Sequence, residues 1–229
     1  MLRLFVILLF SFVSQLGYAE GAGRDLLLIE AHAYRLTSDI SILALQEGGR
    51  RYQQRLDGTI SSGSEVAARL KDDLPRVSKQ WQISVNFIQD NREVAASNSD
   101  VSFTNDLERV QGSLYERILQ AKAEMSLEAL NQSDRASLIA LIALEQMVAE
   151  YMYYNINVFG GHAITDSKMS DNAALFRDSV AQITEHDSRR KAIEAKWKFI
   201  EKTLLNYNEQ SATFIVMKTT DKIRSLLPV

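Results

Sequence analysis

One arginine of the sequence lies where a charged side chain is unexpected. Arg35 falls between Ala33 and Leu36 in a mostly apolar run. A guanidinium there must reach water or find a negative partner, because an unpaired buried charge is very costly. Its planar fork of N–H donors suits an anion with two oxygens. We therefore expect Arg35 to hold a small anion, unless it reaches solvent or pairs with Asp39, four residues later on the same helical face.

Most catalytic and metal chemistries lack their residues in this chain. Cys is absent, and none of the three His residues has a Glu three positions before it, which excludes the Glu-x-x-His pairs of di-iron bundles. Covalent haem would need Cys pairs. The sequence has neither a Gly-x-Ser-x-Gly elbow nor a phosphate-binding Gly loop. We expect no catalytic residue, no metal and no cofactor, and hence a protein that is not an enzyme.

The elements that must position Arg35 are helices. Apolar residues recur at steps of three and four from Asp25 to Gly48-Gly49 and again over residues 103–125, which is the period of an amphipathic helix. Residues 137–154 are apolar on nearly every face, as in a helix surrounded by others. Ten Gly and two Pro are too few for a sandwich or barrel. The sequence predicts an all-α fold.

The helical pattern is present twice. Gly48-Gly49 and Gly160-Gly161 each end a long helix, and a Trp follows each pair, Trp81 in the first half and Trp197 in the second. A polar loop is expected after each pair, at residues 57–59 and 165–171. We predict an internal repeat of two consecutive antiparallel helical bundles, each like a four-helix bundle, over residues 20–130 and 131–229. Both Trp side chains should be buried near the middle of their bundles.

Polar segments mark the expected helix boundaries. Residues 91–100 have no period and should form a loop, while Asp72-Asp73 and Pro75 should begin the helix of the first Trp. The boundary between the repeats should lie at residues 131–134, with Ser133 or Asp134 as N-cap. The alternative is an uninterrupted helix over residues 103–159.

The N-terminus has the pattern of an export signal. One Arg precedes an apolar run over residues 4–13, and Gly17 and Ala19 suit the −3 and −1 positions of a signal peptidase site. We expect a signal peptide at residues 1–19 and a periplasmic mature chain without a stable membrane span. The alternative is an uncleaved anchor, although the run is short for a bilayer. A formal net charge of −3 gives no basic footprint, so nucleic acid is not an expected partner.

With these features the chain resembles a family of periplasmic helical sensors, that of the type IV pilus chemoreceptor PilJ and of NarX-type nitrate-sensing kinases. The first helix of that family carries Ala-Gly-Arg-Gln-Arg-Met-Leu-Ser-Gln-Arg. Residues 31–39, Ala-His-Ala-Tyr-Arg-Leu-Thr-Ser-Asp, keep the first Ala, the second Arg, an apolar residue for the Met, and the Ser. Residues 133–138 keep only the first Arg. The resemblance implies a four-helix sensor fold in which Arg35 and Arg135 meet an anionic ligand.

Two functions are compatible with these features. The first is a non-catalytic, sensor-like binding protein whose partners are a small anion and a membrane receptor. Receptors of the resembled family continue into a transmembrane helix and an output domain, whereas this sequence ends at Val229. The second is an adaptor of an envelope assembly, such as a pilus or secretion machine, with no small ligand. A cavity lined by Arg or Tyr inside a bundle would favour binding, and a solid core with an exposed apolar stripe would favour the adaptor.

Overall fold

The computed structural model describes residues 2–98, 100–128, 130–157, 169–183, 187–207 and 212–229, the side chains of residues 2–20 and 98 excepted. Every regular element in the described part is a helix, which confirms the all-α fold class. The helices are α1 (Leu2–Leu45), α2 (Arg50–Arg69), α3 (Pro75–Asp90), α4 (Arg92–Asn98), α5 (Val101–Glu124), α6 (Gln132–Ile156), α7 (Met169–Ala181), α8 (Asp187–Leu205) and α9 (Thr213–Arg224).

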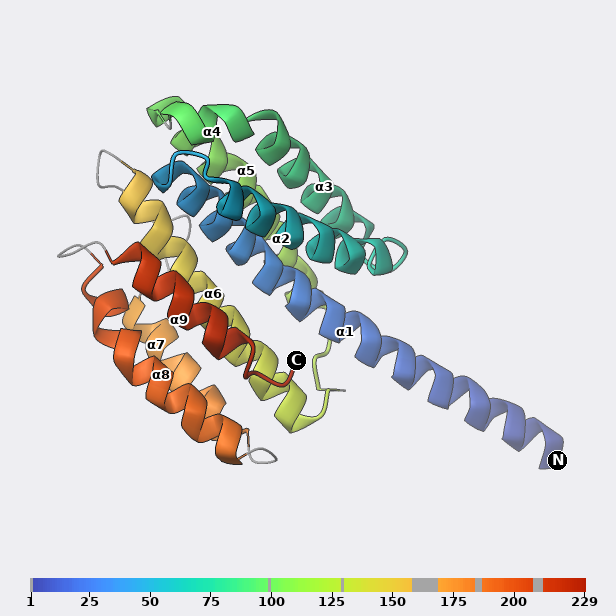
Figure 1. Ribbon diagram of the computed structural model, residues 1–229. Coiled ribbons are helices and arrows are strands. Elements are labelled where there is room, and N and C mark those ends of the chain that lie inside the picture. Colours follow the sequence, from blue (N-terminus) through green and yellow to red (C-terminus); the bar gives the residue numbers. More distant parts are fainter. Residues whose placement is uncertain (1, 99, 129, 158–168, 184–186, 208–211) are drawn as a thin grey trace.

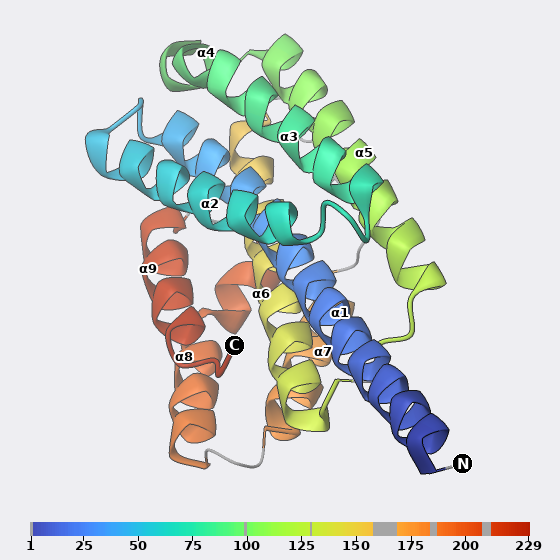
Figure 2. The same ribbon diagram turned by 90° about the vertical axis from the view of Figure 1, so that its right-hand side faces the viewer.

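The helices form two sets that share one core. In each set successive long helices alternate in direction, α1, α2, α3 and α5 in the first and α6 to α9 in the second (Figures 1 and 2). The most extensive helix pairing in the molecule is between α1 and α6, which run side by side through its centre. Buried apolar residues of both sets belong to a single hydrophobic cluster. The two sets therefore pack as one body through α1 and α6.

Helix α1 begins earlier than the periodicity predicts. It runs from Leu2 without a break through the segment expected to be a signal peptide, and that segment extends beyond the other helices (Figure 1). Because the side chains of residues 2–20 lie outside the described residues, the signal peptide stays a prediction. From Leu26 onward the described side chains of α1 are largely buried.

Helix α1 ends just before the first Gly pair, but Glu47 rather than a Gly occupies the left-handed cap position. Glu47 and Gly48 both have positive φ, 48° and 73°, and the Gly48 N–H donates to the Leu43 carbonyl at 3.0 Å. This is the hydrogen bond of a Schellman-type helix end. A Cβ on Gly48 would lie 2.7 Å from the Cβ of Ala96 in α4, so Gly is needed for both conformation and space. The second pair, Gly160-Gly161, lies outside the described residues.

The two Trp side chains are buried, as predicted. Trp81 on α3 is 1% exposed and packs on Gly63 of α2, where an added Cβ would lie 2.2 Å from the indole. Trp197 on α8 is 4% exposed, and its ring centroid lies 4.5 Å from that of Phe176 on α7. Each Trp thus lies between the second and third helices of its set.

Two segments predicted as loops are helical. Residues 57–59 lie inside α2, where Gly58 faces open space and Thr59 points into the core. The helix tolerates Gly58 because its buried residues keep helical spacing on both sides, from Leu56 to Val66. Residues 92–98 of the expected loop 91–100 form α4, whose buried Ala95 packs against α1. The predicted second polar loop, 165–171, is described only from Met169, and there it is already part of α7.

Helix α6 begins within the segment 131–134, but its N-cap differs from the expected one. Helix α5 ends at Glu124, so the alternative of one helix over residues 103–159 is wrong. Asn131 is the N-cap of α6 and accepts a hydrogen bond from the Asp134 N–H at 2.8 Å, in place of the predicted Ser133 or Asp134. Pro75 opens α3 as predicted, whereas its N-cap is Leu74, without a side-chain cap from the acidic pair before it.

Helix α6 is the central helix of the second set. Within the described residues it is the one helix long and apolar enough to cross a membrane, and 89% of its apolar window is buried inside the structure. That burial is typical of a core helix. Glu145, directly after its most apolar stretch, is only 1% exposed, so the core of the molecule contains a carboxylate that needs a partner.

Candidate functional site

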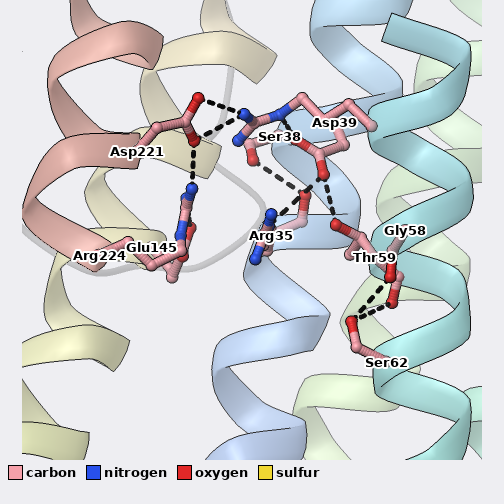
Figure 3. Close-up of polar contacts among 10 residues, drawn as sticks. Arg35, Ser38, Asp39, Gly58, Thr59, Ser62, Glu145, Asp221 and Arg224 are labelled. Carbon is pink, nitrogen blue, oxygen red and sulfur yellow. Dashed lines mark hydrogen bonds and ion pairs between the residues drawn. The ribbon is translucent and has the colours of Figure 1, made fainter. Parts of the chain in front are cut away.

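A cluster of charged side chains lies inside the molecule where α1, α2, α6 and α9 meet (Figure 3). Its first member is Asp39 on α1, which is 1% exposed. One oxygen of Asp39 accepts a hydrogen bond from Nε of Arg55 on α2, and the other accepts one from the Thr59 hydroxyl at 2.6 Å. Both oxygens of Asp39 are therefore occupied by α2.

The cluster continues onto the C-terminal helix. Arg55 also donates through one terminal nitrogen to both oxygens of Asp221 on α9, at 2.6 and 2.7 Å. Asp221 accepts a further hydrogen bond from Arg224, one turn later. Arg224 in turn donates from Nε and from a terminal nitrogen to the two oxygens of Glu145 on α6, the second at 2.8 Å. This is the bidentate geometry of the strongest charge-assisted pairs.

Burial and charge act in opposite directions on these groups. Burial alone would raise the pKa of Asp221, but hydrogen bonds and charges from Arg55 and Arg224 outweigh it and hold the pKa below its usual value. Burial alone would likewise lower the pKa of Arg224, and Glu145 overcomes this and raises it. Arg55 behaves in the same way, with Asp39 as its main partner. All three groups stay charged because each is paired.

Arg35 is the weakly partnered cation of the cluster. Its Nε lies 3.7 Å from an oxygen of Asp39, beyond hydrogen-bond length, and this buried atom has no hydrogen-bond partner. Each oxygen of Asp39 accepts a hydrogen bond from another residue, one from Arg55 and the other from Thr59. The Arg35 side chain is 26% exposed, so solvent or a small molecule can reach it. The predicted internal competitor, Asp39, therefore engages Arg35 only by a loose ion pair.

The surroundings of Arg35 disfavour its charge. Burial lowers the pKa of the Arg35 guanidinium, and the positive charge of Arg224 lowers it further, while Glu145 and Asp39 act against both. Figure 3 shows the guanidinium of Arg35 between Asp39 and the pair of Glu145 and Arg224. A site in which a cation is incompletely neutralised is one where an additional anion is favoured.

His32 is a second incompletely satisfied group on the same helix. It precedes Arg35 by three residues and so lies on the same face of α1. Its Nδ1 is buried without a hydrogen-bond partner. Burial lowers the pKa of His32 to about 4, and the charge of Arg35 contributes. A neutral imidazole beside an underneutralised guanidinium adds a hydrogen-bonding group to the site.

Arg135 lies elsewhere. It occupies the first turn of α6, whereas Arg35 is in the C-terminal half of α1, so the structure does not bring the two predicted residues together or place them at matching levels. Arg135 is exposed and lines a surface cleft of about 590 Å³ between α6 and α7, together with Asp178, Ser179 and apolar residues. This cleft is open to the surface and so differs from the cavity inside a bundle that is expected of a binding protein.

Four of the charged residues around Arg35 were not predicted. Arg55 lies on α2 next to a segment interpreted as a loop, and Glu145 was noted only as the end of an apolar run. Asp221 and Arg224 have ordinary i, i+3 spacing on a helix with many charges. Glu145 alone gave a usable signal, since an acidic residue in a helix that is apolar on every face requires a cation.

The residues of the cluster do not form a metal centre. Within the described ranges, no group of three or more His, Cys, Asp or Glu side chains is placed to hold a metal ion. The three carboxylates are bonded to guanidinium groups instead. What Arg35 offers at this position is a positive charge with planar N–H donors.

Comparison with known proteins adds no family to this description. No family model matches the chain, and neither curated proteins nor solved structures include a significant match.

Proposed function

We propose that this protein is a non-catalytic, sensor-like binding protein that takes a small anion at Arg35. The observation that carries the proposal is the contrast among the three clustered arginines. Arg55 and Arg224 each make two or more hydrogen bonds to carboxylates, whereas Arg35 has only the 3.7 Å contact with Asp39. A carboxylate or small oxyanion would supply the two-oxygen partner that the Arg35 fork lacks.

The chemical class of the ligand follows from this arrangement. Anions that suit a partly exposed guanidinium at a helix junction are small, carry one or two charges, and present two oxygens in a plane. Catalysis is not part of the proposal, because the acids of the cluster are held as hydrogen-bond acceptors by arginines. In the periplasmic setting predicted from the N-terminus, the bound state would be read by a membrane receptor.

A thermal-shift screen tests the proposal. Sulfate, phosphate, acetate and succinate would be added to the protein lacking residues 1–19, at constant ionic strength. At one hundred times its dissociation constant, a specific anion adds about 2.7 kcal/mol to the free energy of unfolding. Arg35→Gln should lose that gain, whereas Arg109→Gln, which removes an exposed charge from α5, should keep it. An equal gain in both variants would indicate general ion effects and contradict an Arg35 site.

A second candidate function, the envelope adaptor, is favoured by a different observation. Phe199 on α8 is 66% exposed, and Phe214 and Ile215 at the start of α9 are 48% and 46% exposed. Exposed apolar side chains on neighbouring helices are typical of protein-binding surfaces. The same thermal-shift screen separates the two functions, because the adaptor requires no anion to bind.

A further inference from the structure

The cluster around Arg35 also determines how the C-terminal helix is held. Helix α9 packs its buried residues Val216, Met217 and Ile223 mainly on α6 and α8, within the second set. One of its polar links reaches further: Asp221 pairs with Arg55 of α2, whereas Arg224 pairs with Glu145 of α6. At its start, the Ala212 N–H donates to the Tyr151 hydroxyl at 2.6 Å. The end of α9 thus rests on charges at the junction of the two sets.

The charge of α9 that acts most on Arg35 is Arg224. Figure 3 shows the guanidinium of Arg35 beside the pair of Arg224 and Glu145, and the positive charge of Arg224 opposes that of Arg35. Glu145 and Asp221 neutralise Arg224 through hydrogen bonds, but neither of these carboxylates is hydrogen-bonded to Arg35. The charge of Arg35 on α1 is therefore less compensated than that of Arg224 beside it on α9.

We propose that occupancy of the Arg35 site controls how tightly α9 docks, with a bound anion strengthening the contact between α9 and the junction. This rests on the proposed function for the identity of the site. An anion at Arg35 cancels the repulsion between Arg35 and Arg224 and attracts Arg224 directly. By linkage, whatever loosens α9 weakens anion binding by the same factor. The responsive element of the protein is then α9, whose start carries the exposed Phe214 and Ile215.

Hydrogen–deuterium exchange of peptides from α9, read relative to peptides from α3, tests the coupling. Phosphate and succinate would serve as probes. In the parent protein, the probe that shifts the melting temperature should also slow the deuterium exchange of α9 roughly two- to fivefold. That factor corresponds to a change in one charge pair. Slower exchange spread evenly over α3 and α9 would overturn the proposal, because it would report global stabilisation only.

A charge variant separates this proposal from the binding function. Arg35→Gln removes the repulsion with Arg224 and should slow the exchange of α9 in the absence of any anion, and added probe should then have no effect. Arg109→Gln makes the same charge change on an exposed residue of α5 and should leave α9 unchanged. If no probe shifts the melting temperature, the binding function fails and the proposal fails with it, and slower α9 exchange in Arg35→Gln would then report only the repulsion between Arg35 and Arg224. If α9 exchanges equally fast in Arg35→Gln and in the parent protein, the coupling is refuted even where an anion binds.

Discussion

Replacement of Arg224 by Met should destabilise the protein far more than replacement of an exposed arginine. The Arg224 side chain is 13% exposed and its partner Glu145 is 1% exposed, so Arg224→Met leaves a buried carboxylate without its cation. Breaking a buried pair in this way costs about 3–5 kcal/mol. The matched control is Arg109→Met, because Arg109 forms an i, i+3 pair with Asp106 in which both side chains are mainly exposed. That pair should contribute about 0–1 kcal/mol.

The double variant Arg224→Met with Glu145→Met identifies the origin of the loss. Replacing both members of a buried pair by apolar residues is often neutral or stabilising, so the double variant should be more stable than Arg224→Met alone. The assay is urea unfolding at pH 7, followed by far-UV circular dichroism. The reasoning is refuted if Arg224→Met costs no more than Arg109→Met, since the cluster would then behave as a set of solvated surface pairs.

Three further outcomes are expected. Gly63→Ala should lower the free energy of unfolding in urea by about 1–3 kcal/mol, because the new Cβ would meet the Trp81 indole. Gly58→Ala on the same helix should raise it by about 0.5–1 kcal/mol, because nothing lies near that position. Equal effects of the two substitutions would contradict the packing of Trp81 on Gly63. Burial holds the pKa of His32 at about 4, whereas the unfolded side chain titrates near 6.5, so the free energy of unfolding should fall as the pH drops from 6.5 towards 4. Between pH 7 and pH 5 this loss of stability should be about 2 kcal/mol smaller in His32→Gln than in the parent protein. Parallel pH profiles of the two proteins would contradict a buried neutral imidazole. Iodide should quench the fluorescence of the native protein only weakly, since Trp81 and Trp197 are 1% and 4% exposed, and strong quenching of either would contradict its burial.

The fold class could be predicted because helical periodicity is a local property of the sequence. The burial of Trp81 and Trp197 and the helix end at Gly48 followed from it. Segments 57–59 and 92–98 were interpreted as loops from composition alone, and tertiary packing makes them helical. The extensive pairing of α1 with α6 joins residues far apart in the sequence and leaves no local signal.

The candidate site was predictable in part for the same reason. Arg35 was recognisable because its charge interrupts an apolar run, and Asp39 because of the i, i+4 spacing. The pairing of Asp39 with Arg55 is what leaves Arg35 underneutralised, and it depends on how α2 packs on α1. Arg224 and Asp221 enter from α9, at the other end of the chain. Their role could be read only from the assembled helices.

The side-chain resonance of Arg35 provides the most direct test of the anion site. Two-dimensional ¹H–¹⁵N spectra resolve arginine Nε–H groups, and Arg35→Lys assigns the signal. We predict that in the free protein the Arg35 Nε–H lacks the downfield shift of the hydrogen-bonded Nε–H groups of Arg55 and Arg224. Titration with phosphate or succinate should then move the Arg35 signal in a saturable manner, more than the signals of the other two arginines. An Arg35 signal that stays fixed up to the highest concentration of either anion would contradict the site.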